Sequence, residues 1–290
     1  MTEVLIRPLA ERDVEHTWDM AHTALQTAGR EYGWHMPDAD DLMRRRGRQR
    51  LAHMLVHDPE GSWVAEQGGE VIGIGAATRR GPLWFLSLLT VATHVQSRGV
   101  GRRLLDATLQ TLGPAGAICA SDDPKALRRY RLAGFDLQPR YEAKGVLDRS
   151  AVPAIQGVRL GSYDDDRDFV EDIATRLRTA AHGVDLDFFA ATDRPLFVTD
   201  TAAGRGYVTC TESGVGVLGA TTPAAARSLL WTALAEATAD EVGLLWLRHD
   251  QSWAIDAALE ARLSMSPRGS FATFGAIGPM SPYIPSGALG

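Results

Sequence analysis

Residues 89–109 read LTVATHVQSRGVGRRLLDATL and combine a short apolar strand, a glycine-containing loop and the start of an amphipathic helix. The loop has the pattern Gln-x-x-Gly-x-Gly, with its glycines at Gly99 and Gly101. The first turn of a helix has N–H groups without intrahelical acceptors and carries the positive end of the helix dipole. A phosphate there gains hydrogen bonds and charge stabilisation, and glycines let the main chain approach its oxygens. The stretch therefore predicts a site for an anion such as a pyrophosphate.

Three arginines accompany the two glycines, at Arg98, Arg102 and Arg103. Positive side chains oppose the dipole at a helix start, so their presence indicates that the loop meets negative charge. The helix continues with apolar residues at helical spacing and ends at Gly113-Pro114.

The composition limits the class of protein. The chain has 290 residues, of which 45% are hydrophobic and 23% charged, and this predicts a soluble protein with two globular domains. The formal net charge of −6 argues against broad binding of nucleic acid or of an anionic membrane. Two cysteines give no disulfide framework, and the sequence does not open on a signal segment. We therefore expect a cytoplasmic monomer or homodimer without a bound metal.

The spacing of apolar residues predicts mixed strands and helices in the first half. The expected strands cover residues 5–8, 63–66, 71–77, 83–91, 117–121 and 135–146, and the expected helices cover residues 13–27 and 40–57, with two more after Gly99 and Asp123.

Two other phosphate-binding motifs fit this order less well. The dinucleotide-binding motif Gly-x-Gly-x-x-Gly needs a third glycine where this chain has Leu104, although Asp122 or Asp123 imitates the ribose-binding acid. That motif also follows the first strand of its unit, whereas about ninety residues precede this loop. A P-loop is excluded because no Gly-Lys-Ser/Thr follows the glycines.

The first half resembles the GNAT superfamily of acyl-CoA-dependent N-acetyltransferases. The resemblance rests on the order of elements and on three segments: IRPLAERD at 6–13, QSRGVG at 96–101 and DPKALRRYRLAGF at 123–135. Asp123 stands where the family usually has asparagine, and Thr93 where a proline is common. The resemblance implies an α/β (α+β) fold, in which a mixed, mostly antiparallel twisted sheet is flanked by helices, and acetyl-CoA or another short acyl-CoA as the donor substrate.

The same resemblance implies roles for particular residues. The backbone of residues 89–91 would meet the pantetheine arm, and residues 96–102 would hold the pyrophosphate. Tyr130 would be catalytic, as the general acid that protonates the leaving thiolate, because a phenol and a thiol have comparable acidities. The implied cofactor-binding residues are Leu89, Thr90, Val91, Gln96, Ser97, Arg98, Gly99, Val100, Gly101, Arg102 and Asp123.

A general base is not evident from the sequence. Related enzymes often have a glutamate on the strand before the loop, but residues 83–91 contain no carboxylate, and Ser87 could at most orient a water. An amine can also lose its proton through a water chain. The arginine run of residues 44–50 could attract an acidic acceptor or form a solvated helix face. The remaining candidates for the base lie near the expected acceptor wall and are Glu31, His35, Asp38 and Asp41.

The second half repeats the plan of the first half weakly. Its segment GVRLGSYDDD at 157–166 is similar to IRPLAERD, with Arg159 and Asp165 matching Arg7 and Asp13. The chain thus resembles tandem members of the superfamily.

The second half lacks the chemical signature of the first. Its loop is only Thr221-Thr222-Pro223-Ala224, and Ala258 stands where the first half has Tyr130. We therefore expect an acetyl-CoA-binding domain at 1–150 and a degenerate GNAT-like domain at 157–290 that binds no acetyl-CoA. Because residues 143–153 leave little chain for another strand, a strand supplied across the domain boundary is a further hypothesis.

The function expected from the sequence is transfer of an acetyl group to a primary amine of a small molecule, by direct attack on acetyl-CoA in a ternary complex. Two alternatives stay open: a non-catalytic acyl-CoA-binding or regulatory protein, and a protein N-terminal or lysine acetyltransferase. Tyr130 favours chemistry, because a sensor needs the loop but not the acid.

Overall fold

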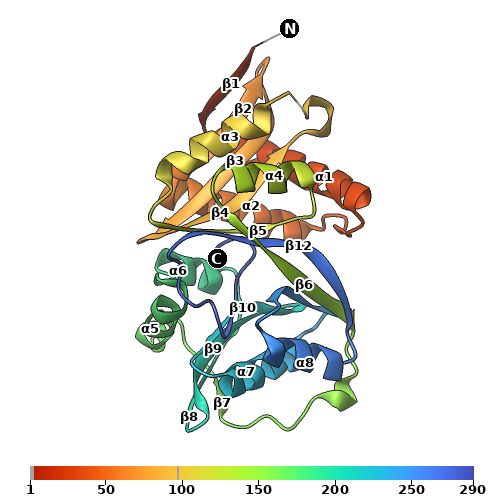
Figure 1. Ribbon diagram of the computed structural model, residues 1–290, viewed down its shortest axis with the longest axis vertical. Coiled ribbons are helices and arrows are strands. Elements are labelled where there is room, and N and C mark those ends of the chain that lie inside the picture. The colour runs from red at the N-terminus through yellow and green to blue at the C-terminus, as the bar shows by residue number, and fades with distance from the viewer. Residues whose placement is uncertain (1–2, 97) are drawn as a thin grey trace.

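The computed structural model describes residues 3–96 and 98–290, in which two β-sheets are covered by helices (Figure 1). The strands of the first half are β1 (Val4–Pro8), β2 (Ser62–Gln67), β3 (Glu70–Arg80), β4 (Leu83–Val91), β5 (Ala115–Ala120) and β6 (Asp136–Val146). Its α-helices are α1 (Val14–Tyr32), α2 (Asp41–His57), α3 (Val100–Thr108) and α4 (Pro124–Leu132). The order of elements predicted for this half is confirmed.

The second half contributes seven strands and four α-helices to the described residues. The strands are β7 (Val158–Leu160), β8 (Leu196–Thr201), β9 (Gly204–Thr211), β10 (Gly214–Ala220), β11 (Glu241–Arg248), β12 (Ser264–Gly275) and β13 (Tyr283–Ile284). The helices are α5 (Arg167–Arg178), α6 (Val184–Ala191), α7 (Pro223–Glu236) and α8 (Ser252–Glu260). The sequence analysis missed α6, where the buried Asp185 interrupts the apolar pattern.

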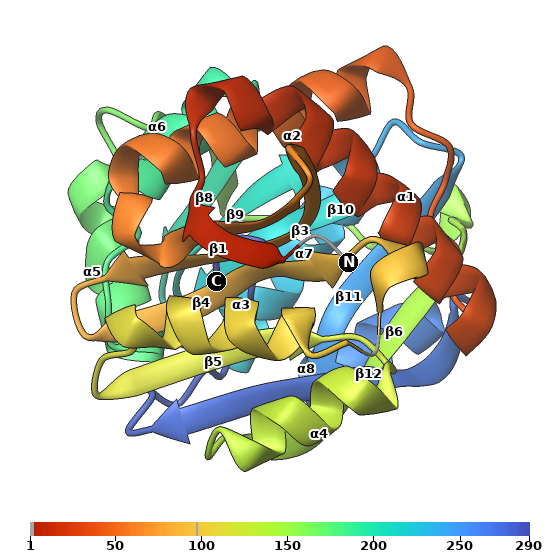
Figure 2. The ribbon, with the colours of Figure 1, turned by 90° about the horizontal axis from the view of Figure 1, so that it is seen from above.

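The larger sheet has eight strands in the order β1-β2-β3-β4-β5-β12-β6-β11, and the smaller has the order β13-β10-β9-β8-β7. All pairings are antiparallel except that of β4 with β5, which is parallel. Seen from above, α1 and α2 cover one face of β1–β5, and α3 covers the other (Figure 2). Helix α4 lies on the same side as α3, next to β6 and β12. This is the mixed, mostly antiparallel sheet flanked by helices that the sequence predicted.

The two halves exchange strands within the larger sheet. Strand β12 comes from the end of the chain and lies between β5 and β6, with Phe271 opposite Cys119 on one side and Gln138 on the other. Strand β6 in turn lies between β12 and β11, two strands of the second half. The hypothesis of a strand supplied across the boundary is thus confirmed.

Strand β12 needs a glycine where it passes β5. Its register with β6 shifts between Pro267 and Ser270, and Gly269 within this bulge has φ +58°. A Cβ on Gly269 would lie 2.1 Å from the carbonyl oxygen of Ala120. The close approach of the two backbones therefore depends on a residue without a side chain.

The weak internal repeat is visible as two equivalent ion pairs. The guanidinium of Arg7 contacts the Asp13 carboxylate at 2.6 Å, and Asp13 accepts from the N–H of Ala10. In the second half Arg159 contacts Asp166 at 2.5 Å, and Asp166 likewise accepts from a backbone N–H. Matching Asp165 to Asp13 was wrong by one residue, because the turn of the second half contains one more residue before its acid.

Candidate functional site

Strands β4 and β5 separate in the middle of the larger sheet. Their parallel pairing joins residues 83–86 to residues 115–118, and among the described residues no pairing between them continues beyond Leu86. A bulge in the β3–β4 register falls at the same place, so that Ser87 has no partner residue on β3. Residues 88–91 are then held by β3 alone. The side of β4 that faces β5 therefore presents backbone groups without ladder partners there, and Leu89, Thr90 and Val91 lie on this segment.

The glycine loop lies at the N-terminus of α3, as predicted. Gly99 is the residue preceding the first helical turn and has φ +81°, a left-handed conformation that favours glycine. No side chain of the described residues caps this helix end. The amide of Gln96 donates to the carbonyl oxygen of Val91 at 3.1 Å and so ties the loop to the end of β4. The predicted residue Ser97 lies outside the described residues.

Gly101 makes room for an arginine that the sequence analysis did not single out. A Cβ at Gly101 would lie 2.8 Å from Nη1 of Arg129. Arg129 belongs to α4, so its guanidinium reaches the start of α3 from a separate helix. In the sequence, the feature that could have pointed to Arg129 is its position next to Tyr130.

The three arginines of the loop differ in their surroundings. Arg103 donates to the carbonyl oxygen of Val4 at 2.9 Å, and it is therefore directed towards β1. Arg102 is exposed and lies 3.5 Å from Asp106 in an i,i+4 pair. Arg98 is exposed.

Two other predicted cofactor residues have defined local roles. The side chain of Val100 is buried in the core, so only its backbone could meet an anion. Asp123 caps α4 by accepting from the N–H of Lys125 at 2.8 Å.

Tyr130 is the buried residue of α4 and is 5% exposed. It packs in one apolar cluster with Leu86 and Leu89, which lie on either side of the point where β4 leaves β5. Burial, and secondarily the charge of Asp123, raise the pKa of the Tyr130 phenol. The structure thus places Tyr130 in the same apolar cluster as residues of the separated part of β4.

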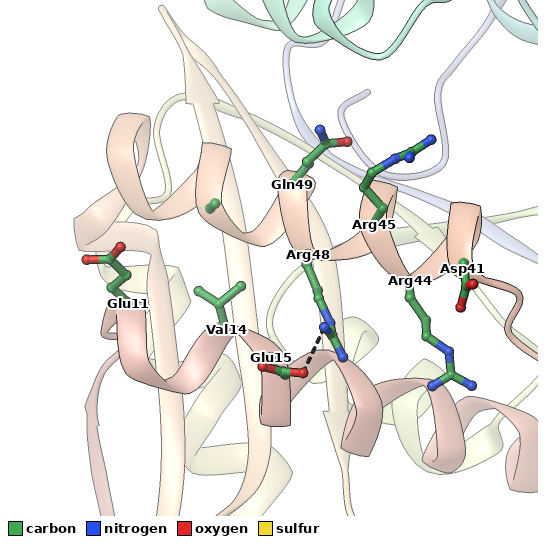
Figure 3. Close-up of a pocket in the computed structure, with 9 residues that line it drawn as sticks. Glu11, Val14, Glu15, Asp41, Arg44, Arg45, Arg48 and Gln49 are labelled. Carbon is green, nitrogen blue, oxygen red and sulfur yellow. Dashed lines mark ion pairs between the residues drawn. The ribbon is translucent and has the colours of Figure 1, made fainter.

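The four candidate bases are not collected into a site. Glu31, His35, Asp38 and Asp41 are exposed, and Asp38 accepts from the amide of Gln26 at 3.0 Å. Asp41 lies in a groove on the outer side of α1 and α2 (Figure 3).

The arginine run on α2 divides between two faces of the helix. Arg44 and Arg48 lie in the outer groove, where Arg48 contacts Glu15 at 2.8 Å (Figure 3). Arg46 and Arg50 instead line a cavity of about 360 Å³ between this helix and the second half of the chain. The solvated-face interpretation therefore holds for the first pair but not for the second.

This cavity adjoins the separated strands. Leu88, the residue after the bulge in β4, contributes to its wall. The second half contributes Phe188 of α6, Arg194 and Glu212. The second half therefore forms part of a cavity beside β4, in addition to supplying a strand.

A buried histidine of α1 also lines the cavity. His22 is 7% exposed and stacks on Trp18, with ring centroids 5.0 Å apart. Among the described residues neither of its ring nitrogens has a hydrogen-bond partner. An unpaired imidazole can accept a proton, so His22 is a candidate base that sequence reasoning missed. The only signal for it was its spacing from Trp18 and Leu25 on one helix face.

In the second half, the loop that corresponds to the glycine loop caps the helix that follows it. Thr222 caps α7 by accepting from the N–H of Ala225, and its hydroxyl donates to the carbonyl oxygen of Ala203. The hydroxyl of Thr221 exchanges two hydrogen bonds with the backbone of Arg205. The groups at this helix start are thus used within the protein.

Two kinds of feature are absent from the described residues. No helix there is both long and apolar enough to span a membrane. No group of three or more His, Cys, Asp or Glu side chains is placed to hold a metal ion in that part of the chain. The histidine pair His53 and His57 on α2 instead has Asp185 as a partner, 3.0 Å from His53.

Several solved structures share this fold over nearly the whole chain. A candidate acetyltransferase from Pyrococcus horikoshii has a TM-score of 0.76 at 18% identity, covering 99% of this chain and 96% of its own. A tandem GNAT protein from the clavulanic acid biosynthesis pathway has a TM-score of 0.58 at 16% identity, with coverages of 95% and 98%. A GCN5-related N-acetyltransferase from Sphaerobacter thermophilus has a TM-score of 0.60 at 15% identity, with coverages of 93% and 95%. The fold is therefore that of tandem GNAT proteins.

One family model matches part of the sequence. Residues 20–135 match the model of the acetyltransferase (GNAT) family. The matched segment includes the glycine loop and Tyr130. No curated protein matches the sequence.

Proposed function

We propose that the protein is an N-acetyltransferase that transfers an acetyl group from acetyl-CoA to a primary amine of a small molecule, by direct attack in a ternary complex. One observation carries this proposal: β4 and β5 separate beside the glycine loop, and Tyr130 belongs to the apolar cluster that Leu89 of the separated segment packs against.

The residues of the first half suit an acyl-CoA. The uncapped start of α3 and the left-handed Gly99 suit a pyrophosphate, and Arg129 adds a positive charge at the same helix end. The unpaired edge of β4 suits the amide groups of a pantetheine arm, which need hydrogen-bond partners of this kind. When bound, acetyl-CoA would supply the activated acetyl group as a thioester.

The transfer step needs a proton donor for the leaving sulfur and a proton acceptor for the amine. The amine nitrogen forms a bond to the thioester carbonyl carbon, the carbon–sulfur bond breaks, and Tyr130 gives its proton to the leaving sulfur. Because burial raises its pKa, the phenol of Tyr130 is protonated at neutral pH and has a proton to give. The amine loses its proton to His22, directly or through water, or to solvent.

We propose that only the first half binds acetyl-CoA. In the second half the start of α7 is capped by Thr222, and Ala258 replaces the catalytic phenol. Of the proposed domains, 1–150 would thus bind acetyl-CoA, and 157–290 would form part of the wall that the acceptor meets. A cytoplasmic location follows from the proposed donor, and the amine acceptor is the proposed partner.

Binding of the donor can be tested at the glycines. Gly99→Val and Gly101→Leu should abolish acetyl-CoA binding in calorimetry, because side chains would occupy the space of the phosphate oxygens. The matched control is Gly81→Val, since Gly81 also has a positive φ of +54° and open space around it but lies at the β3–β4 turn. Unchanged affinity in both loop variants would overturn the proposed donor site.

Transfer to an amine needs a separate measurement. Thiol release from acetyl-CoA should be followed against a library of small amines, with peptides bearing free N-termini or lysines as a second set. Turnover with peptides alone would favour protein acetylation. Acetyl-CoA binding without thiol release from any amine would favour the non-catalytic, regulatory alternative.

A further inference from the structure

The side chains of two arginines of the cavity have no hydrogen-bond or ion-pair partner among the described residues. Arg50 of α2 and Arg194, which follows α6, face the same space from the two halves of the chain. Among the described residues neither guanidinium forms a hydrogen bond or an ion pair, and Nε of Arg50 is buried without a partner. Arg194 lies over the ring of Phe189, 5.0 Å from its centroid, which holds its side chain against the cavity wall.

The other charged groups of the cavity are already satisfied. Glu212 is bound by Arg46 at 2.5 Å, and the carboxylate of Asp40 caps α2 by accepting from the N–H of Met43 at 2.7 Å. The N–H of Met43 is neutral, so Asp40 keeps its negative charge, and the lining side chains carry three positive and two negative charges. Within the described part of the chain, Arg50 and Arg194 are the two cations of the lining without an ion pair. Burial, followed by the charge of Arg194, lowers the pKa of Arg50 to about 10, which reflects the cost of this arrangement.

We propose that Arg50 and Arg194 form an oxyanion-binding subsite in the cavity beside β4, and that the acceptor carries a carboxylate or phosphate group which this subsite binds. Guanidinium groups bind both oxyanions through paired N–H donors, and an anion placed between the two arginines would remove their mutual repulsion.

The size and position of the cavity define the class of acceptor. A volume of about 360 Å³ accommodates a molecule of small-metabolite size. Leu88 lines the cavity, and the separated segment of β4 begins with this residue. An acceptor anchored by its oxyanion can thus extend its amine towards β4. The acceptor part of this inference rests on the proposed acetyltransferase function, whereas the anion subsite does not.

The first experiment measures anion binding without any turnover. Calorimetric titrations of the full chain use inorganic phosphate and succinate, each against chloride at equal ionic strength. The variants are Arg50→Gln and Arg194→Gln, and the matched control is Arg45→Gln, an exposed arginine of the same helix. We expect at least one oxyanion to bind the wild type and the control equally, and both cavity variants roughly tenfold or more weakly.

Stability provides a second readout of the same arrangement. Arg50→Gln should raise the unfolding temperature in chloride, because it removes a half-buried, unpaired charge that faces Arg194. Oxyanion should raise that temperature in the wild type but not in this variant. If Arg50→Gln fails to fold, Arg50→Lys keeps the charge but loses the paired donors, and it should bind the anion more weakly than the wild type.

The second experiment distinguishes the two sources of the oxyanion. Amino acids are compared with their carboxamides, and aminoalkyl phosphates with the matching amino alcohols, as acceptors in the thiol-release assay. A preference for one charged series that disappears in Arg194→Gln identifies the group.

Two results would overturn the subsite: equal anion affinity in the wild type and both cavity variants, or no affinity of the wild type for either probe. If the wild type binds the anion but does not bind acetyl-CoA, only the proposed donor is contradicted.

Discussion

Arg80 of β3 donates to both carboxylate oxygens of Asp185 on α6, from Nε at 2.9 Å and from Nη2 at 2.5 Å. Asp185 is completely buried, and it also lies 3.0 Å from Nε2 of His53. A second acid, Asp58, contacts Nη1 of Arg80 at 2.9 Å. These groups come from both halves of the chain, so a buried ionic cluster holds the wall of the cavity to the larger sheet.

Asp185→Ala should destabilise the protein by about 3–5 kcal/mol, because it leaves part of the Arg80 charge buried and uncompensated. The measurement is the free energy of unfolding in urea. The matched control is Asp187→Ala on the same helix, whose carboxylate is largely exposed and pairs with Arg167. Its loss should cost far less. Equal destabilisation by both substitutions would contradict the role of the cluster.

Tyr130→Phe should lower turnover by about 100-fold or more, the contribution of a positioned general acid. The affinity for acetyl-CoA should stay nearly unchanged, because the ring that packs against β4 is retained. Since burial raises its pKa, ionisation of Tyr130 should not reduce wild-type turnover below pH about 10, the ordinary value of a phenol. Tyr141→Phe, on β6, serves as the control. Full turnover in Tyr130→Phe would remove this residue from the mechanism.

The glycine loop could be predicted from the sequence, because the residues that identify it lie close together in one segment of the chain. Gly99, Gly101 and Tyr130 fall within forty residues, and backbone rules connect a glycine pattern to a helix start. The element order followed from the same kind of local periodicity.

The cavity could not be predicted in this way. Arg50 and Arg194 are separated by more than a hundred residues, and nothing in either neighbourhood indicates that they face each other. His22 has the spacing of an ordinary core residue, and only tertiary packing leaves its nitrogens without partners. The position of β12 is likewise a property of the pairing of strands and not of its own sequence.

His182 should make the stability of the protein depend on pH. It is fully buried between Arg178, which donates to Nδ1, and the hydroxyl of Tyr207, 2.7 Å from Nε2. Burial, and secondarily the charge of Arg178, lower its pKa well below the usual 6.5, so the imidazole is neutral in the folded protein.

The sign of this effect follows from proton binding. Below pH 6.5 the unfolded chain takes up a proton at His182 that the folded protein does not, so stability falls as the pH falls, by up to about 1.4 kcal/mol per pH unit. His182→Gln should lack this pH-dependent contribution. The difference in unfolding free energy between the wild type and this variant should therefore become smaller as the pH falls from 7 to 5. His249→Gln, at an exposed position, should keep the wild-type slope. A difference independent of pH would contradict the neutral buried state.

The exchanged strand predicts that the first half does not fold alone. A chain ending at residue 156 lacks β12 and leaves the edges of β5 and β6 unpaired in the middle of the larger sheet. Unpaired central edges promote aggregation, so this fragment should be insoluble or should lack a cooperative thermal transition. Co-expression of residues 157–290 should restore a soluble complex with the circular dichroism spectrum of the full chain, because it supplies β12. A monomeric fragment of residues 1–156 that unfolds cooperatively would show that the first half is an independent domain and that the exchanged strand is dispensable.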